Sequence, residues 1–263
     1  MRRLGLGFST YLLAGLGVAV STVLALIAVQ VAFTQDGGGP LRALGEPDIR
    51  FAVWLSLWTS TTAAVLALVV AVPAAYALAR FHFRGKALVD GLLDVPIVLS
   101  PVVLGIALIL VFRSAPGRFV EENVLRFVFE VPGILAAQFV LALAMEIRVL
   151  KAAFEDLDPR YEQVARVLGC SPWAAFRRVT LPMSRSALVA AFVLGFSRAL
   201  GDFGATVTVA GSVRFKTETM PIAIYSNLAS VRIGKALGLA LLLTLIALCV
   251  LTLVRAVGAR RRV

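Results

Sequence analysis

Six long apolar segments, separated by short polar loops, set the pattern of this chain. They cover residues 8–33, 51–79, 95–112, 131–147, 187–210 and 236–254. A helix needs roughly 20 apolar residues to cross a bilayer, so these lengths suit membrane spans. Only helices and closed barrels satisfy backbone hydrogen bonds in lipid, and no segment alternates with a period of two residues. We therefore predict an all-α membrane protein of about six transmembrane helices.

The third and fourth segments carry residues that interrupt a uniform span. Pro96 and Pro101 lie near the start of the third segment, and we expect them to bend its helix. Gln138, Glu146 and Arg148 make the fourth segment the most polar of the six. Their side chains are expected to face either a path through the protein or the interior of the helix bundle.

The fifth segment contains two charges, Arg198 and Asp202. A charge near the bilayer centre costs roughly 2.5–3.5 kcal/mol on insertion scales. A spacing of four residues puts both on one face of a continuous helix, where they can form an ion pair. Gly201 and Gly204 would permit close helix approach or a local bend. Two interpretations stay open: this face lines a substrate path, or the ion pair is purely structural.

Composition agrees with a membrane protein, because 60% of the residues are hydrophobic and the mean hydropathy is +0.92. The net charge of +11 raises nucleic acid as a partner. The basic residues lie in short loops between apolar runs, however, which excludes a nucleic-acid-binding domain. Cys170 and Cys249 lie too far apart in depth to form a disulfide, and His82 is expected to be a solvated loop residue.

Lysine and arginine divide unequally between the two sets of loops, with sixteen on one side and nine on the other. The richer side is cytoplasmic by the positive-inside rule, which places both termini inside. The first segment exceeds the roughly 7–15 residues of a signal-peptide core, so we expect it to be retained. Residues 1–263 are thus predicted to form a single transmembrane domain of a multi-pass cell-membrane protein.

A polar insert over residues 158–182 separates the fourth and fifth segments on the cytoplasmic side. Asp158 is a predicted N-cap, with proline following at the first helical position. Gly169 stands where a left-handed residue ends a helix. Ser171 and Pro172 start a second helix, which Leu181-Pro182 ends. The insert is therefore predicted to contain two short helices at an angle.

The apolar residues of this insert recur at helical spacing. They are Tyr161, Val164, Ala165 and Leu168 on the first helix, with Trp173 and Phe176 on the second. Such helices can lie flat on the lipid surface, with their arginines at the headgroups. They can also dock in a groove of a partner protein. The paired caps and the glycine corner favour docking.

The insert resembles the coupling loop of ABC importer permeases, whose signature runs Glu-Ala-Ala, three residues, Gly, and later Leu-Pro. Residues 162–169, followed by Leu181-Pro182, carry the resemblance. Gln163 falls on the glutamate of the strict pattern, Glu162 lies one place earlier, and Val164 replaces the first alanine. In that family the loop inserts into a groove of a cytoplasmic ATPase subunit.

Three further stretches are similar to the molybdate, tungstate and sulfate permeases of this family. They are residues 94–105 in the third segment, 197–205 in the fifth, where glutamate is commoner than Asp202, and 216–225 after it. The resemblance implies a type I ABC importer permease fold with both termini cytoplasmic. It implies a homodimer that carries molybdate or tungstate and meets ATPase subunits inside and a substrate-binding protein outside. Sulfate or thiosulfate is the alternative cargo.

The resemblance also implies a coupling loop over residues 148–186 that contacts the ATPase. Its expected contact residues are Glu162, Gln163, Val164, Ala165, Leu168, Gly169, Ser171, Pro172, Trp173, Phe176, Leu181 and Pro182. The candidate path residues are Arg198, Gly201, Asp202 and Gly204.

No catalytic chemistry is visible in the sequence. Gly85-Lys86-Ala87 lacks the upstream glycine and the Ser or Thr of a P-loop, and no metal-ligand cluster or nucleophile–base pair is apparent. We therefore expect no cofactor on this chain, and ATP and Mg²⁺ on the partner ATPase. A secondary transporter without an ATPase, or a membrane enzyme, is the competing class. The single Arg198–Asp202 pair does not favour an ion-coupled carrier.

Overall fold

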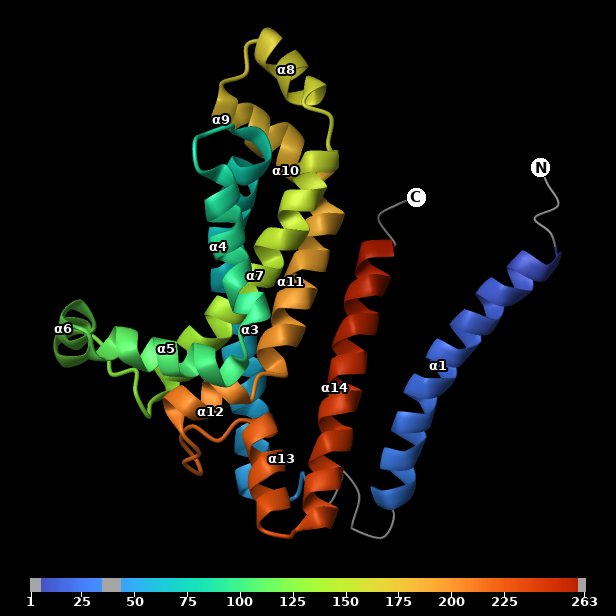
Figure 1. Ribbon diagram of the computed structural model, residues 1–263, viewed down its shortest axis with the longest axis vertical. Helices are drawn as coiled ribbons and strands as arrows, with labels where there is room; N and C mark the ends of the chain where they lie inside the picture. Colours follow the sequence, from blue (N-terminus) through green and yellow to red (C-terminus); the bar gives the residue numbers. More distant parts are fainter. Residues whose placement is uncertain (1–5, 35–43, 260–263) are drawn as a thin grey trace.

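The computed structural model describes residues 6–34 and 44–259, and within them it contains helices, turns and loops but no strand (Figure 1). The helices are α1 Leu6–Thr34, α3 Pro47–Arg80, α4 Lys86–Val98, α5 Pro101–Arg113, α6 Ala115–Asn123, α7 Val131–Asp156, α8 Arg160–Val167, α9 Pro172–Ala175, the π-helical stretch η1 Phe176–Thr180, α10 Leu181–Met183, α11 Arg185–Leu200, α12 Gly204–Ala210, α13 Met220–Ala229 and α14 Ile233–Ala259.

Four of these helices, α1, α3, α7 and α14, are long and apolar enough to cross a membrane. Two bent helix pairs bring the number of candidate spans in the described ranges to as many as six. One pair is α4 with α5, and the other is the α9–α10 stretch with α11. The predicted all-helical class and the approximate number of spans are confirmed.

The predicted bend in the third segment is a break. Helices α4 and α5 meet at an angle of 114° across Leu99 and Ser100. Ser100 leaves the helical conformation, with φ −57° and ψ 135°, which the ring of the following Pro101 favours. Pro101 then starts α5 at a position where its missing N–H costs nothing.

The fifth segment is interrupted between Gly201 and Gly204, the two glycines that were expected to permit a bend, so Arg198 and Asp202 do not lie on one continuous helix. Helix α11 ends at Leu200, and α12 begins at Gly204 after a short break. Asp202 lies in that break and accepts hydrogen bonds from the Thr206 N–H at 2.9 Å and the Thr206 hydroxyl at 2.7 Å. This carboxylate therefore caps the start of α12 instead of standing on the same helix as Arg198.

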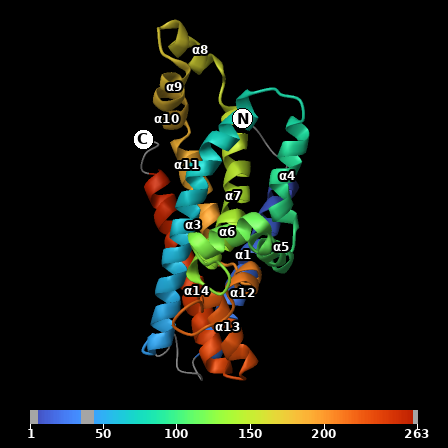
Figure 2. The same cartoon turned by 90° about the vertical axis from the view of Figure 1, so that its left-hand side faces the viewer.

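The core forms where α3, α7 and α11 pack together, with α3 and α7 sharing the most extensive contact (Figures 1 and 2). Helix α3 buries a row of alanines, which are Ala63, Ala64, Ala67, Ala71 and Ala75. Small side chains let helix backbones approach closely, which is how helices associate when lipid supplies no hydrophobic driving force.

Helices α1 and α4 are attached more loosely. Helix α1 stands beside the bundle and packs against α14 (Figure 1), with almost all of its described side chains exposed. Helix α4 buries none of its residues. It is joined to α7 by the ion pair of Asp90 with Lys151 at 2.5 Å and by that of Asp94 with Arg148.

The helices α8 to α10 lie at one end of the molecule, and α13 lies at the other (Figure 1). The first residues of α1 and the last residues of α14 point toward the α8 end (Figure 1). The glycine-rich stretch at residues 36–40 lies outside the described residues.

Candidate functional site

The insert between α7 and α11 folds as two short helices joined at a glycine corner. The Asp158 carboxylate accepts a hydrogen bond from the Arg160 N–H at 2.9 Å, which caps α8. Gly169 has φ +94°, and the Cys170 N–H closes the end of α8 on the Ala165 carbonyl at 3.0 Å. The Ser171 hydroxyl accepts from the Ala174 N–H at 3.2 Å and caps α9. The predicted boundaries at Gly169 and Ser171 are confirmed, and α8 begins at Arg160, one residue later than predicted.

The second helix of the insert does not stop at Leu181-Pro182. It passes through the π-helical turn η1 into α10, which ends at Met183, one residue beyond Pro182. Pro182 has no N–H, so it cannot donate the usual helical hydrogen bond to the carbonyl four residues earlier. The wider π-helical turn η1, just before it, accommodates this missing bond. The α9–α10 stretch then meets α11 at 73°.

The insert exposes a set of apolar and polar side chains at this end of the molecule. Val167 and Leu168 are 87% and 80% exposed. Also exposed are Tyr161, Gln163, Val164, Gly169, Ser171, Pro172 and Trp173. A surface groove of about 470 Å³ is lined by Gln163, Arg166, Val167, Cys170 and Pro172. Exposed apolar area of this kind on a short helix fits contact with a partner protein or with the lipid surface.

Other predicted contact residues of the insert face inward. Phe176 is buried, with its ring centroid 4.5 Å from that of Tyr76 on α3. Ala165, Leu181 and Pro182 are half-buried. Trp173 lies over Phe176 with 5.7 Å between the ring centroids, so one exposed aromatic covers a buried one.

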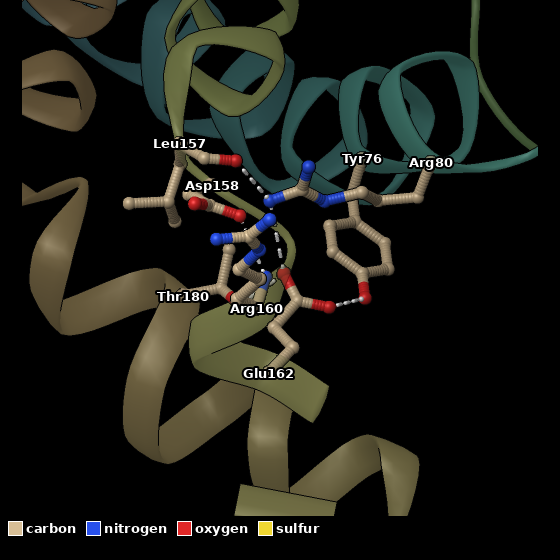
Figure 3. A network of polar contacts seen from close by, with 7 residues as sticks. All are labelled: Tyr76, Arg80, Leu157, Asp158, Arg160, Glu162 and Thr180. Carbon is tan, nitrogen blue, oxygen red and sulfur yellow. Dashed lines mark hydrogen bonds and ion pairs between the residues drawn. The ribbon is translucent and has the colours of Figure 1, made fainter. Parts of the chain in front are cut away.

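Glu162 also faces inward, and it lies at the centre of a polar network (Figure 3). Its carboxylate accepts hydrogen bonds from the Tyr76 hydroxyl and the Thr180 hydroxyl, each at 2.7 Å. It pairs with Arg80 at 3.2 Å, and the two side chains are only 13% and 12% exposed. Arg80 also donates to the Leu157 carbonyl at 2.8 Å. Sequence reasoning missed these partners, because Tyr76 and Arg80 lie far from the insert along the chain.

The candidate path residues lie together at the junction of α11 and α12. The guanidinium of Arg198 is 3.9 Å from Asp202 Oδ1, a loose ion pair, and Arg198 is partly exposed. The second Asp202 oxygen is committed to Thr206, while the side chain is 1% exposed. Gly201 ends α11, and a Cβ at Gly204 would lie 2.9 Å from Pro101. The glycine at position 204 thus permits the close approach of α12 to α5.

The polar residues of the fourth segment point in different directions. Gln138 and Glu146 are fully buried in the bundle, and Gln138 Oε1 and both Glu146 carboxylate oxygens lack a hydrogen-bond partner. Arg148 is exposed and pairs with Asp94.

His82 is exposed in the turn before α4. No group of three or more metal-ligating side chains occurs among the described residues.

Comparison with known proteins identifies the family. Residues 67–263 match the family model of the binding-protein-dependent transport system inner membrane component. The sulfate transport system permease protein CysW of Escherichia coli (strain K12) is 34% identical over 225 residues, which cover 83% of this chain and 77% of that protein. The molybdenum transport system permease protein ModB of Mycobacterium bovis is 35% identical over 245 residues, covering 92% and 91%.

A solved structure shows the same fold. A bacterial ABC transporter involved in the import of the acidic polysaccharide alginate contains a chain that superposes with a TM-score of 0.76 at 17% identity. The match covers 98% of this chain and 96% of that one. The fold of this chain is thus one already seen in an importer. The chain is a member of the binding-protein-dependent transport system inner membrane component family, the multi-pass permease subunits of ABC importers, in which ATP hydrolysis belongs to a separate ATPase.

Proposed function

We propose that this permease passes an oxyanion, molybdate or tungstate, from an external binding protein to the cytoplasm by alternating access. ATP bound with Mg²⁺ on separate ATPase subunits drives the cycle. The observation that carries the proposal is the insert at residues 158–182, which exposes Val164, Val167, Leu168 and Trp173. Its helices lie at one end of the bundle (Figure 1).

The exposed face of α8 fits the docking of a short helix in a groove of the ATPase. Apolar anchors on one helix face are the usual means of such recognition. The groove beside Gln163 and Arg166 adds polar groups at the edge of these anchors. Movement of the ATPase would displace α8 and, through it, the bundle. The alternative is that this face of α8 lies on the lipid surface, a contact that requires no ATPase.

The insert is proposed to be cytoplasmic, as are both termini. The loops on the α8 side carry the larger share of lysine and arginine, which favours the cytoplasm. The start of α1 and the end of α14 lie toward the same end of the molecule (Figure 1).

A second copy of this permease is proposed to complete the path. Helices α4 and α5 carry exposed apolar side chains, among them Leu88, Val98 and Leu110, and α4 buries no residue of its own. A partner subunit or lipid must cover this surface. A homodimer would bring two Arg198–Asp202 junctions to one transporter.

The molybdenum permeases among the relatives support molybdate. Tungstate is included because the stretches named above resemble molybdate and tungstate permeases alike. The molybdenum permease of Mycobacterium bovis aligns over nearly the whole of both chains, whereas the sulfate permease CysW aligns over 77% of its own length. Sulfate or thiosulfate is the second candidate, because CysW is similar at almost the same identity. Arg198, partly exposed and only loosely paired, is the cation we propose for the oxyanion.

Uptake into liposomes tests this function. The liposomes hold the permease with its ATPase and binding protein, and the substrate is labelled molybdate with tungstate or sulfate as competitor. We expect ATP-dependent uptake that tungstate blocks and sulfate does not. Blocking by sulfate would move the assignment to the second candidate. Uptake that continues without ATP would overturn the importer and favour a secondary transporter.

A further inference from the structure

The carboxylate of Glu162 is fully occupied inside the protein. One oxygen accepts from the Thr180 hydroxyl and pairs with Arg80, and the other accepts from the Tyr76 hydroxyl (Figure 3). Hydrogen bonds to an ionised group are shorter and stronger than neutral ones. The neighbouring side chain of Gln163, by contrast, is exposed in the groove of the insert. Glu162 therefore has little capacity left for a partner protein.

Helix α8 has few other attachments to the bundle. It buries none of its residues, and its main neighbours are α9 and η1, which belong to the same insert. The network of Glu162 instead reaches Tyr76 and Arg80 in the last turns of α3. Arg80 also holds the Leu157 carbonyl just before α8. One arginine thus fixes both the start of the insert and its first helix.

The other end of this link leads into the core. Helix α3 packs along α7 and α11, the two helices that enter and leave the insert. The Tyr76 ring lies between Phe176 of the insert and Phe154 of α7, with centroid distances of 4.5 and 5.9 Å. A displacement of α8 therefore acts on α3 through short polar contacts and on α7 through packed rings.

We propose that Glu162 is a positioning residue that ties α8 to α3, so that displacement of α8 moves the transmembrane helices, and that it is not a contact for the ATPase. The contact role falls instead to the exposed side chains beside it, Gln163 among them. This inference rests on the proposed function of the insert as the ATPase-coupling loop.

Two measurements on the complete transporter separate positioning from contact. One is the amount of ATPase that copurifies with the permease. The other is the number of ATP molecules hydrolysed per molybdate imported in liposomes. A contact residue alters the first, whereas a positioning residue alters the second while the ATPase still binds. A residue needed only for folding lowers the amount of complex without changing the stoichiometry of the complex that remains.

We expect Glu162→Ala to copurify with the ATPase within about twofold of the unmodified chain and to raise the ATP used per molybdate at least fivefold. A twofold ratio corresponds to only about 0.4 kcal/mol. Gln163→Ala should do the reverse and reduce copurification while import stays coupled in the complex that forms. Glu155→Gln, a half-exposed carboxylate at the end of α7 outside this network, is the matched control.

Tyr76→Phe and Thr180→Val remove single hydroxyls from the network and test the same link if Glu162→Ala does not fold. Each should raise the ATP used per molybdate. In a double variant that combines either change with Glu162→Gln, the increase should be smaller than the sum of the two single increases, because both changes break the same link. Loss of ATPase binding by Glu162→Ala, or unchanged stoichiometry in these variants, would overturn the inference. Failure of the unmodified chain to bind any ATPase would overturn the proposed function together with it.

Discussion

Gly195 of α11 faces Glu146 of α7 so closely that a Cβ at Gly195 would lie 2.1 Å from Glu146 Oε1 and 2.7 Å from its Cδ. Glu146 is fully buried, so its side chain has no solvent into which it can withdraw. Any larger residue at position 195 would force the buried Glu146 side chain to move.

Replacing Gly195 with alanine should therefore destabilise the permease. We expect Gly195→Ala to lower the free energy of unfolding by about 1–3 kcal/mol through overpacking, and to lower the thermal midpoint of the purified protein. Gly91→Ala in α4 is the control, since nothing lies within 4 Å of its Cβ position. Equal stability of the two variants would contradict the tight crossing.

Glu146 itself should tolerate a neutral isostere. Neither carboxylate oxygen has a hydrogen-bond partner, and a buried unpaired carboxylate costs more than a buried amide. Glu146→Gln should match or exceed the thermal stability of the unmodified chain, whereas Glu146→Ala should lose stability by leaving a cavity. A marked loss in the glutamine variant would argue for a charged partner of Glu146.

Arg198 should matter for uptake if it meets the oxyanion. Arg198→Ala is expected to slow molybdate uptake at least tenfold in the reconstituted transporter while the amount of permease in the membrane stays normal. Arg185→Ala, exposed at the other end of α11, is the control and should transport normally. Unimpaired uptake by the Arg198 variant would favour the structural role of its ion pair.

Asp202 should act through its hydrogen bonds more than through its charge. Asparagine keeps an oxygen for the Thr206 N–H and hydroxyl, whereas alanine leaves both without an acceptor. Asp202→Ala should therefore cost about 0.5–2 kcal/mol of stability, as the loss of a helix cap does. Asp202→Asn should cost less. Thermal unfolding of both variants measures the difference, and equal losses would instead point to the charge.

Glu218 should make stability depend on pH. It lies between α12 and α13, where burial raises the pKa of its carboxyl, and Asp48 adds to this effect while Arg214 and a hydrogen bond to Ser226 oppose it. The folded protein therefore holds this proton at a pH where the unfolded chain has lost it. Stability should fall as pH rises above the ordinary glutamate value of 4.5.

Glu218→Gln should remove this part of the pH dependence. Thermal unfolding of both proteins between about pH 4 and pH 8 measures it. Glu121→Gln, a carboxylate of another loop that binds the Phe127 and Val128 N–H groups, should leave the dependence due to Glu218 in place. Parallel curves for the unmodified chain and the Glu218 variant would contradict the prediction.

The sequence by itself determined the helical membrane class and most of the local boundaries. Apolar length predicts spans because lipid offers the backbone no hydrogen bonds. The capping residues Asp158 and Ser171 and the left-handed Gly169 act on backbone groups within a few residues, so their effect is visible in sequence. The resemblance of residues 162–182 to a coupling loop also led to the family that the comparisons confirm.

Only the tertiary structure decided which way the key side chains point. Glu162 and Gln163 are neighbours in sequence, yet one is held by Tyr76, 86 residues away, and the other is exposed. The break at Asp202 and the crowding of Glu146 against Gly195 likewise depend on neighbouring helices. The physical reason is that helical periodicity records which residues share a face. The partner across that face depends on how separate helices pack.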